Sequence, residues 1–145
     1  MYIPKYFKAV ELVDKATYQK CKHRGDEWLL GILFDERLLR VIDTIRDQFG
    51  PMTINDWSWG GPSQYRGWRS PDCDIGATLS QHRFGRAVDM IPKDMHPKAI
   101  RADIIKNQNK SPHTKFIGGL EMGISWLHID VRTRNKDGEI NLFYP

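Results

Sequence analysis

The order of patterns along the chain predicts a small α+β domain in which helices pack on a central antiparallel sheet. The clearest helical periodicity lies in the N-terminal part, at residues 35–49, and short runs of strand-like composition gather towards the C-terminus. Helices followed by antiparallel strands are typical of α+β domains. The chain has 145 residues and contains no repeat, low-complexity tract or linker, so residues 1–145 are expected to form one domain.

Three segments are expected to be helical. The clearest of them can be capped by Asp35 and is ended by Gly50-Pro51. Its apolar face consists of Leu38, Leu39, Ile42, Ile45 and Phe49. A short helix is expected around residues 9–18, and another over residues 97–106, which begin with a proline.

Strand-like runs follow the main helix. They occupy residues 52–57, 86–91, 116–121, 126–132 and 139–144. Gly123 is expected to join the third and fourth strands, and residues 135–138 (Asn-Lys-Asp-Gly) are a hairpin-turn signal before the last one. Residues 58–78 are rich in Gly, Ser, Pro and Asp, and a loop of this length inside a compact domain is often functional.

Composition narrows the classes of partner. The net charge is +4, and the basic residues are dispersed among acidic ones. This charge would help the protein approach an anionic polymer, but without a binding motif or a concentrated basic patch no nucleic-acid partner is expected. No stretch approaches the roughly 20 apolar residues that span a bilayer, so no membrane insertion is expected. Residues 1–20 lack the pattern of a signal peptide, which predicts synthesis in the cytoplasm. Cys21 and Cys73 are expected to be free thiols.

The most specific chemistry lies in two short stretches, residues 80–89 and 126–132. Zinc prefers imidazole and carboxylate ligands where thiolates are absent, and a catalytic zinc site needs three protein ligands and one open position. His82, Asp89 and His128 supply that set. A single histidine is more often a packed or surface residue than a ligand. The longer pattern Ser-x-His-x-x-Gly-x-Ala-x-Asp makes a metal site the favoured interpretation.

Spacing within the two stretches agrees with convergence on a metal. Gly85 permits a tight backbone path between His82 and Asp89. His128 and Asp130 are two residues apart on an expected strand, so they share one face. Only one of them need bind the metal. The other could hold that ligand in its orientation without touching the metal.

These motifs resemble those of the zinc D-Ala-D-Ala carboxypeptidase family, within the lysostaphin and hedgehog-type metallopeptidase superfamily. The resemblance extends over most of the chain and implies a small α+β fold of the hedgehog type. The matching elements are residues 6–12, Gly67-Trp68-Arg69-Ser70-Pro71, Gly76-Ala77, residues 80–89, Gly118-Gly119 and residues 128–132.

The resemblance implies a role for individual residues. The zinc ligands would be His82, Asp89 and His128, and Arg69 would hold the substrate carbonyl or the developing oxyanion. Ser80 would brace this loop at the substrate site rather than act as a nucleophile, because no Gly-x-Ser-x-Gly elbow surrounds it.

Further residues are expected to border the substrate. Trp59 and Tyr65 are expected to form a wall of the cleft, whereas Trp126 is expected in the core. Asp130 is expected beside the substrate, where it could also hold His128 or pair with Arg132.

The general base is the one departure from the family pattern. Many relatives have a glutamate three residues before the last ligand, where this chain has Ser125. The nearest preceding acid is Glu121, seven residues before His128, which would face away from it on one unbroken strand. A bulge or turn at Gly123 could restore the facing, so Glu121 is the favoured base. Asp130 is the other candidate, and a site without a base is the third reading.

The resemblance therefore implies a zinc-dependent peptidase that cleaves stem peptides of bacterial peptidoglycan. The bond would be D-Ala-D-Ala, as in a carboxypeptidase, or L-Ala-D-Glu, as in an endopeptidase. Such a protein would be a monomeric phage endolysin that reaches the wall after holin-type release, or a lysin built into the virion. The alternative is a catalytically weak or inactive phage structural or binding protein on the same fold. The chain shows no carboxylate pair of the glycosidase type.

Overall fold

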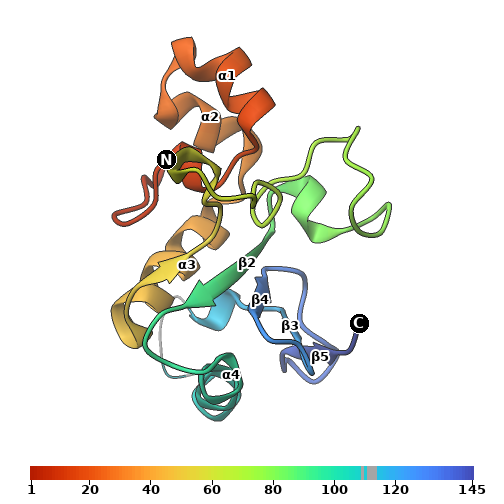
Figure 1. Ribbon diagram of the computed structural model, residues 1–145. Coiled ribbons are helices and arrows are strands. Elements are labelled where there is room, and N and C mark those ends of the chain that lie inside the picture. Colours follow the sequence, from red (N-terminus) through yellow and green to blue (C-terminus); the bar gives the residue numbers. More distant parts are fainter. Residues whose placement is uncertain (109, 111–113) are drawn as a thin grey trace.

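Helices and one mixed sheet form the regular structure of the chain (Figure 1). A computed structural model describes residues 1–108, 110 and 114–145. Its helices are α1 (Lys15–Cys21), α2 (Asp26–Leu33), α3 (Glu36–Phe49) and α4 (Pro97–Lys106). Its strands are β1 (Met52–Thr53), β2 (Ala87–Pro92), β3 (Gly119–Glu121), β4 (Leu127–Asp130) and β5 (Asn141–Phe143). The predicted α+β class is confirmed.

Local chemistry explains the helices. The Asp35 side chain accepts a hydrogen bond of 3.0 Å from the Arg37 amide and so caps α3, and Gly50 ends α3 with a φ of 87°. The predicted bounds of α4 are also confirmed. The helix expected around residues 9–18 is divided into a 3-10 helix at Ala9–Glu11 and α1, because the Asp14 side chain accepts from the Thr17 amide and starts a new helix. Helix α2 was missed. No helix in the described part of the chain is long and apolar enough to span a bilayer.

The sheet has the strand order β1-β2-β4-β3-β5. Neighbouring strands are antiparallel, except that β5 runs parallel to β3. The β3–β4 hairpin confirms the expected turn near Gly123. In Figure 1, α1 and α2 lie at one end of the molecule and α4 at the other, with β2 between them.

The expected final hairpin is wrong. Its turn does form, since the Gly138 amide donates to the Asn135 carbonyl at 3.0 Å. However, β2 and β4 already pair along one edge of β4, and β3 occupies the other. The last strand crosses instead to the free edge of β3, where it lies parallel to β3. The strand expected at residues 52–57 is also shorter, and gives way to a 3-10 helix at Trp57–Trp59.

Alternation along the central strands separates a core face from a polar face. Val88 and Met90 of β2 and Leu127 and Ile129 of β4 belong to the hydrophobic core, together with the apolar faces of α3 and α4. The intervening residues of both strands are Asp89, His128 and Asp130. These three polar side chains are also buried. The second face of the sheet therefore carries a cluster of polar groups that solvent barely reaches.

The N-terminal segment is tied to α3 through one carboxylate. Asp43 is buried, and its two oxygens accept from the Tyr2 hydroxyl at 2.6 Å, the Lys5 amide at 2.5 Å and the Tyr6 amide at 3.2 Å. Burial and the hydrogen bond to Asp43 raise the pKa of Tyr2 to about 12. The hydroxyl therefore stays protonated in the folded protein at pH values where it ionises in the unfolded chain.

We expect Tyr2→Phe to lower the free energy of unfolding at pH 7 by about 1 kcal/mol, the usual value of one partly buried hydrogen bond. Since the folded pKa exceeds the unfolded value of 10.0, this contribution is complete below pH 10 and declines as the pH rises towards 12. Urea unfolding between pH 7 and 11 measures it. Tyr144→Phe is the control, because that side chain is exposed. A difference between wild type and Tyr2→Phe that grows with pH would contradict the assignment.

Candidate metal centre

Three buried side chains converge from three different elements. His82 lies on the short 3-10 helix Gln81–Phe84, Asp89 on β2 and His128 on β4. One potential ligand atom from each lies within 4.8 Å of the other two. His128 Nδ1 is 2.8 Å from Asp89 Oδ1, and His82 Nε2 is 3.4 Å from Asp89 Oδ2. The residues that the sequence singled out as a ligand set are therefore neighbours in space.

Backbone geometry explains this convergence. Asp89 and His128 are direct cross-strand partners in the β2–β4 ladder, so their side chains leave the same face. Gly85 turns the chain from the 3-10 helix into β2 with a φ of 64°. A Cβ at Gly85 would overlap the Leu33 carbonyl, so the position has no room for any other residue.

The second nitrogen of each histidine is held from behind. His82 Nδ1 lies 2.8 Å from the Gly67 carbonyl oxygen, which can only accept, so Nδ1 carries the hydrogen and the Nε2 lone pair faces Asp89. His128 Nε2 lies 3.2 Å from Asp130 Oδ2 and donates to it. Partners of this kind fix the orientation of metal-binding imidazoles. Two imidazoles and one carboxylate, without a thiolate, fit a zinc ion with an open position.

The charge states follow from the same contacts. Burial opposes ionisation of Asp89, but hydrogen bonds with His128 and His82 outweigh it and hold the pKa of Asp89 well below its usual value. Burial would lower the pKa of His128, but hydrogen bonds to Asp130 and Asp89 raise it to about 9. Burial lowers the pKa of His82. A metal ion that binds at His128 Nδ1 must therefore displace a proton, whereas His82 is ready to bind.

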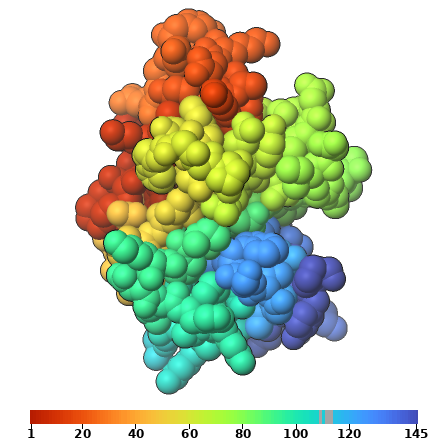
Figure 2. Space-filling view, in the orientation of Figure 1, coloured from red at the N-terminus to blue at the C-terminus, as the bar shows by residue number. Residues whose placement is uncertain are grey.

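A cavity of about 460 Å³ opens onto the three residues. Its wall comes from the loop and 3-10 helix that carry Arg69 and His82 and from the C-terminal strands that carry Glu121 and Phe143. Figure 2 shows the surface indented between these two parts, coloured green and blue. The long polar loop predicted to be functional thus borders the cavity.

Arg69 and Ser80 both line this cavity. Arg69 Nη2 donates to Asp89 Oδ2 at 3.0 Å, and its Nε donates to the Tyr65 carbonyl at 2.7 Å. Gly76 allows the guanidinium to approach, because a Cβ there would lie 2.7 Å from Arg69 Nη1. Arg69 is therefore fixed in direct contact with one of the candidate ligands.

Glu121 also faces the cavity, with Oε2 3.9 Å from His128 Nδ1. The turn considered at Gly123, rather than one unbroken strand, connects Glu121 to His128, and Glu121 faces His128 as expected. They lie on the neighbouring strands β3 and β4, whose register places Leu120 opposite Ile129 and so brings Glu121 beside His128. Cross-strand neighbours share a face. Gly123, with a φ of 72°, lies in the turn between the strands.

Other expected site residues lie elsewhere. Asp130 is fully buried behind His128, and its oxygens are occupied by His128 and Arg132, so contact with a substrate is excluded. Trp59 lines a separate hollow with Tyr6 and Ile91. Tyr65 lines another, beside Asp14 and Cys73, and reaches Arg69 only through its backbone carbonyl.

Three residues were missed as components of the site. Trp126, which was expected in the core, lines the cavity together with Arg132 and Phe143. Phe143 comes from β5, whose position beside β3 was not predicted. Arg132 was named only as a possible partner of Asp130, and this pair forms, with Arg132 Nη2 donating to Asp130 Oδ2 at 2.6 Å.

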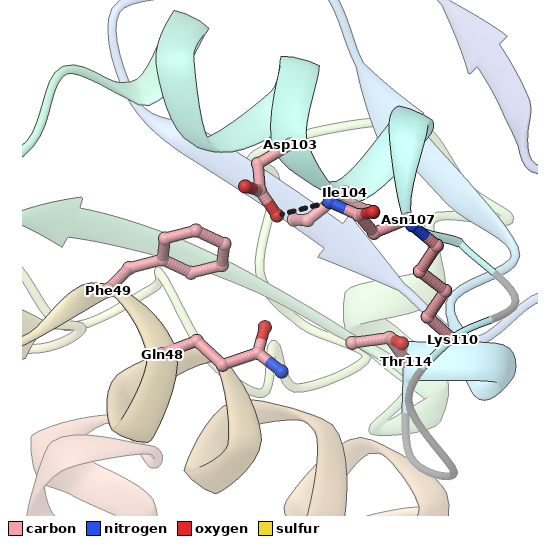
Figure 3. Close-up of a pocket in the computed structure, with 7 residues that line it drawn as sticks. All are labelled: Gln48, Phe49, Asp103, Ile104, Asn107, Lys110 and Thr114. Carbon is pink, nitrogen blue, oxygen red and sulfur yellow. Dashed lines mark hydrogen bonds between the residues drawn. The ribbon is translucent and has the colours of Figure 1, made fainter.

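A further hollow of about 380 Å³ lies between the ends of α3 and α4 (Figure 3). Phe49 and Ile104 give it an apolar side, and Asn107 Nδ2 donates to Asp103 Oδ1 at 3.2 Å on the other. Among the described residues only His82, Asp89 and His128 form a group able to hold a metal ion, and these residues border the larger cavity of about 460 Å³.

Comparison of the chain with models of protein families, with characterised proteins and with solved structures found no match. The site is therefore identified by its geometry and by the sequence motifs.

We expect the purified protein to bind about one zinc ion per chain, and His82→Ala and His128→Ala each to abolish this binding. Each variant removes one of the three residues that form the only group able to hold a metal ion within the described residues. Elemental analysis and titration with a zinc indicator provide the measurement. His23→Ala is the matched control, since His23 is exposed and does not line the cavity. Equal zinc binding by all three variants would exclude the centre.

Proposed function

We propose that the protein is a zinc-dependent peptidase that hydrolyses stem peptides of bacterial peptidoglycan. The observation that carries the proposal is the buried His82–Asp89–His128 group at a cavity into which a separate carboxylate, Glu121, also points. The stem-peptide substrate comes from the resemblance of the motifs around Arg69, His82 and His128 to those of the D-Ala-D-Ala carboxypeptidase family.

The donor set suits zinc, which lowers the pKa of a bound water to about 7 and polarises a carbonyl. Hydrolysis then needs a group that takes a proton from water and returns it to the leaving amine. Glu121 is suited to this work, because its carboxylate faces the cavity beside His128 without an ion-pair partner as close as those of Asp89 and Asp130.

Arg69 is suited to stabilise the negative charge that develops on the substrate oxygen. Its hydrogen bonds to Asp89 and to the Tyr65 carbonyl hold the guanidinium in one orientation at the cavity wall. A fixed cation aimed at the reacting carbonyl needs no reorganisation during the reaction. Ser80 borders the same cavity and can contribute a hydroxyl to substrate binding.

A second candidate function is a phage structural or binding protein with an inert metal site. The observation in its favour is Ser125, which is exposed and stands where many relatives have the catalytic glutamate. The two candidates differ in one measurable property, because only the peptidase converts a stem peptide into smaller fragments.

We expect Glu121→Gln to keep its zinc and to lower kcat on a synthetic stem peptide by roughly 100-fold or more, the usual contribution of a general base. Asp130→Asn should instead weaken zinc binding by about 10- to 100-fold, because the Asp130 carboxylate fixes the orientation of the His128 ring. For each variant, mass spectrometry of the peptide fragments measures activity, and elemental analysis measures zinc content. Glu27→Gln, an exposed acid, is the control. Full activity of Glu121→Gln would remove it as the base, and an inert zinc-loaded wild type would favour the binding protein.

We expect Arg69→Ala to keep zinc and to lower kcat/KM by on the order of 100-fold, the usual effect of losing one oxyanion donor. The three ligands remain in the variant, so zinc content separates loss of catalysis from loss of the metal. Thermal unfolding shows whether the loop still folds. Unchanged kinetics would mean that Arg69 only braces Asp89.

A further inference from the structure

Arg132 is the second arginine of the metal cavity, and it is rigidly anchored. Its Nε donates to Asp130 Oδ1 at 2.8 Å and to Oδ2 at 2.9 Å, and its Nη2 donates to Oδ2 at 2.6 Å. The Asp130 side chain is fully buried, and His128 and Arg132 occupy both of its oxygens. The pair is therefore fixed in place.

The surrounding chain is built to admit this guanidinium. A Cβ at Gly119 would lie 2.5 Å from Asp130 Oδ1 and 2.7 Å from Arg132 Nε, so only glycine leaves room for the pair. On the other side, the guanidinium carbon lies 4.4 Å from the centre of the Phe143 ring. The Arg132 guanidinium thus lies between Gly119 and the Phe143 ring. Surface ion pairs are usually not packed in this way.

This anchoring leaves one edge of the guanidinium for a ligand. All of the hydrogen bonds found for the side chain use Nε and Nη2, and within the described residues Nη1 donates to no protein group. The side chain lines the cavity and is 35% exposed. A guanidinium presents donors that match the two oxygens of a carboxylate.

Charge in the cavity favours the same ligand. Two arginines, Arg69 and Arg132, line it with two acids, Asp89 and Glu121, and Asp130 behind the wall adds one more negative charge. Metal-bound imidazoles are neutral, so these five charges and a divalent ion would sum to +1. The loaded site would therefore attract an anionic group rather than repel it.

We propose that Arg132 is a specificity-determining residue, which binds a carboxylate of the substrate near the scissile peptide bond. The inference rests on the proposed peptidase function and deepens it. Within stem peptides that have L-lysine at the third position, two carboxylates could serve: the C-terminal one and that of the D-isoglutamate residue. Their shared chemistry is what the free edge of Arg132 recognises.

Three synthetic stem pentapeptides test the proposal on the zinc-loaded wild type. One keeps both carboxylates, the second has a C-terminal amide, and the third has D-isoglutamine in place of D-isoglutamate. We expect one of the two amidations to lower kcat/KM by roughly 10- to 100-fold, the effect of losing a charge-assisted hydrogen bond. The same amidation should weaken binding to the Glu121→Gln variant, measured by calorimetry. The amidation that lowers kcat/KM identifies the carboxylate that Arg132 binds.

The role of Arg132 is tested by two variants that differ in charge. With Arg132→Gln, the kcat/KM values for the peptide with the free carboxylate and for its amidated counterpart should agree within about twofold. Arg132→Lys keeps the charge and should restore part of the preference for the free carboxylate. Arg37→Gln is a matched control, because Arg37 forms the same type of pair with Asp35, two residues before it, away from the cavity. Zinc content and thermal unfolding are recorded for each variant.

The outcomes separate the inference from the function. Equal kcat/KM for all three peptides in the wild type, or an unchanged preference in Arg132→Gln, would overturn the role of Arg132 and leave the peptidase proposal standing. If no peptide is cleaved, the peptidase proposal fails. The calorimetric comparison of acid and amide then still decides whether Arg132 binds a carboxylate, since equal affinities would exclude it.

Discussion

The antiparallel pairing of β2 with β4 is the constraint on which the rest of the site depends. It sets Asp89 directly opposite His128 and Ala87 opposite Asp130. Because side chains alternate between faces, the same register sends Val88, Met90, Leu127 and Ile129 into the hydrophobic core. A shift of one residue would exchange the polar and apolar sets. Burial of the core therefore enforces the register that assembles the candidate metal centre.

The polar face is stable because each buried charge has a partner. Asp89 contacts His82, His128 and Arg69, and Asp130 contacts His128 and Arg132. Unpaired, such groups would be very costly to bury. Paired, they form one connected network that runs from the loop at Arg69 to the end of β4. The network holds each group in one orientation, which is what a metal site and a specific binding cavity both require.

Local pattern predicted much of the fold. Asp35, the apolar face of α3 and Gly50 define a helix without tertiary help, and Pro97 starts α4 where it was expected. The final hairpin was wrong because a turn signal specifies only a reversal of the chain. It does not say which strand edge is free, and β4 had none to offer. Helix α2 was missed because the residue before it, Gly25, has no side chain that could cap the helix and signal its start.

The sequence by itself determined the chemistry of the candidate site, because His82, Gly85, Asp89 and His128 lie in short motifs whose spacing constrains the backbone. Only the tertiary structure decided which groups face the cavity. Glu121 turns inward because β3 lies beside β4, and Trp126, Arg132 and Phe143 join it through strand pairings made over long distances in the chain. Trp59, in a 3-10 helix, and Tyr65, in the long loop, line other hollows. Side-chain direction across strands depends on register, and register is a property of the assembled sheet rather than of any one segment.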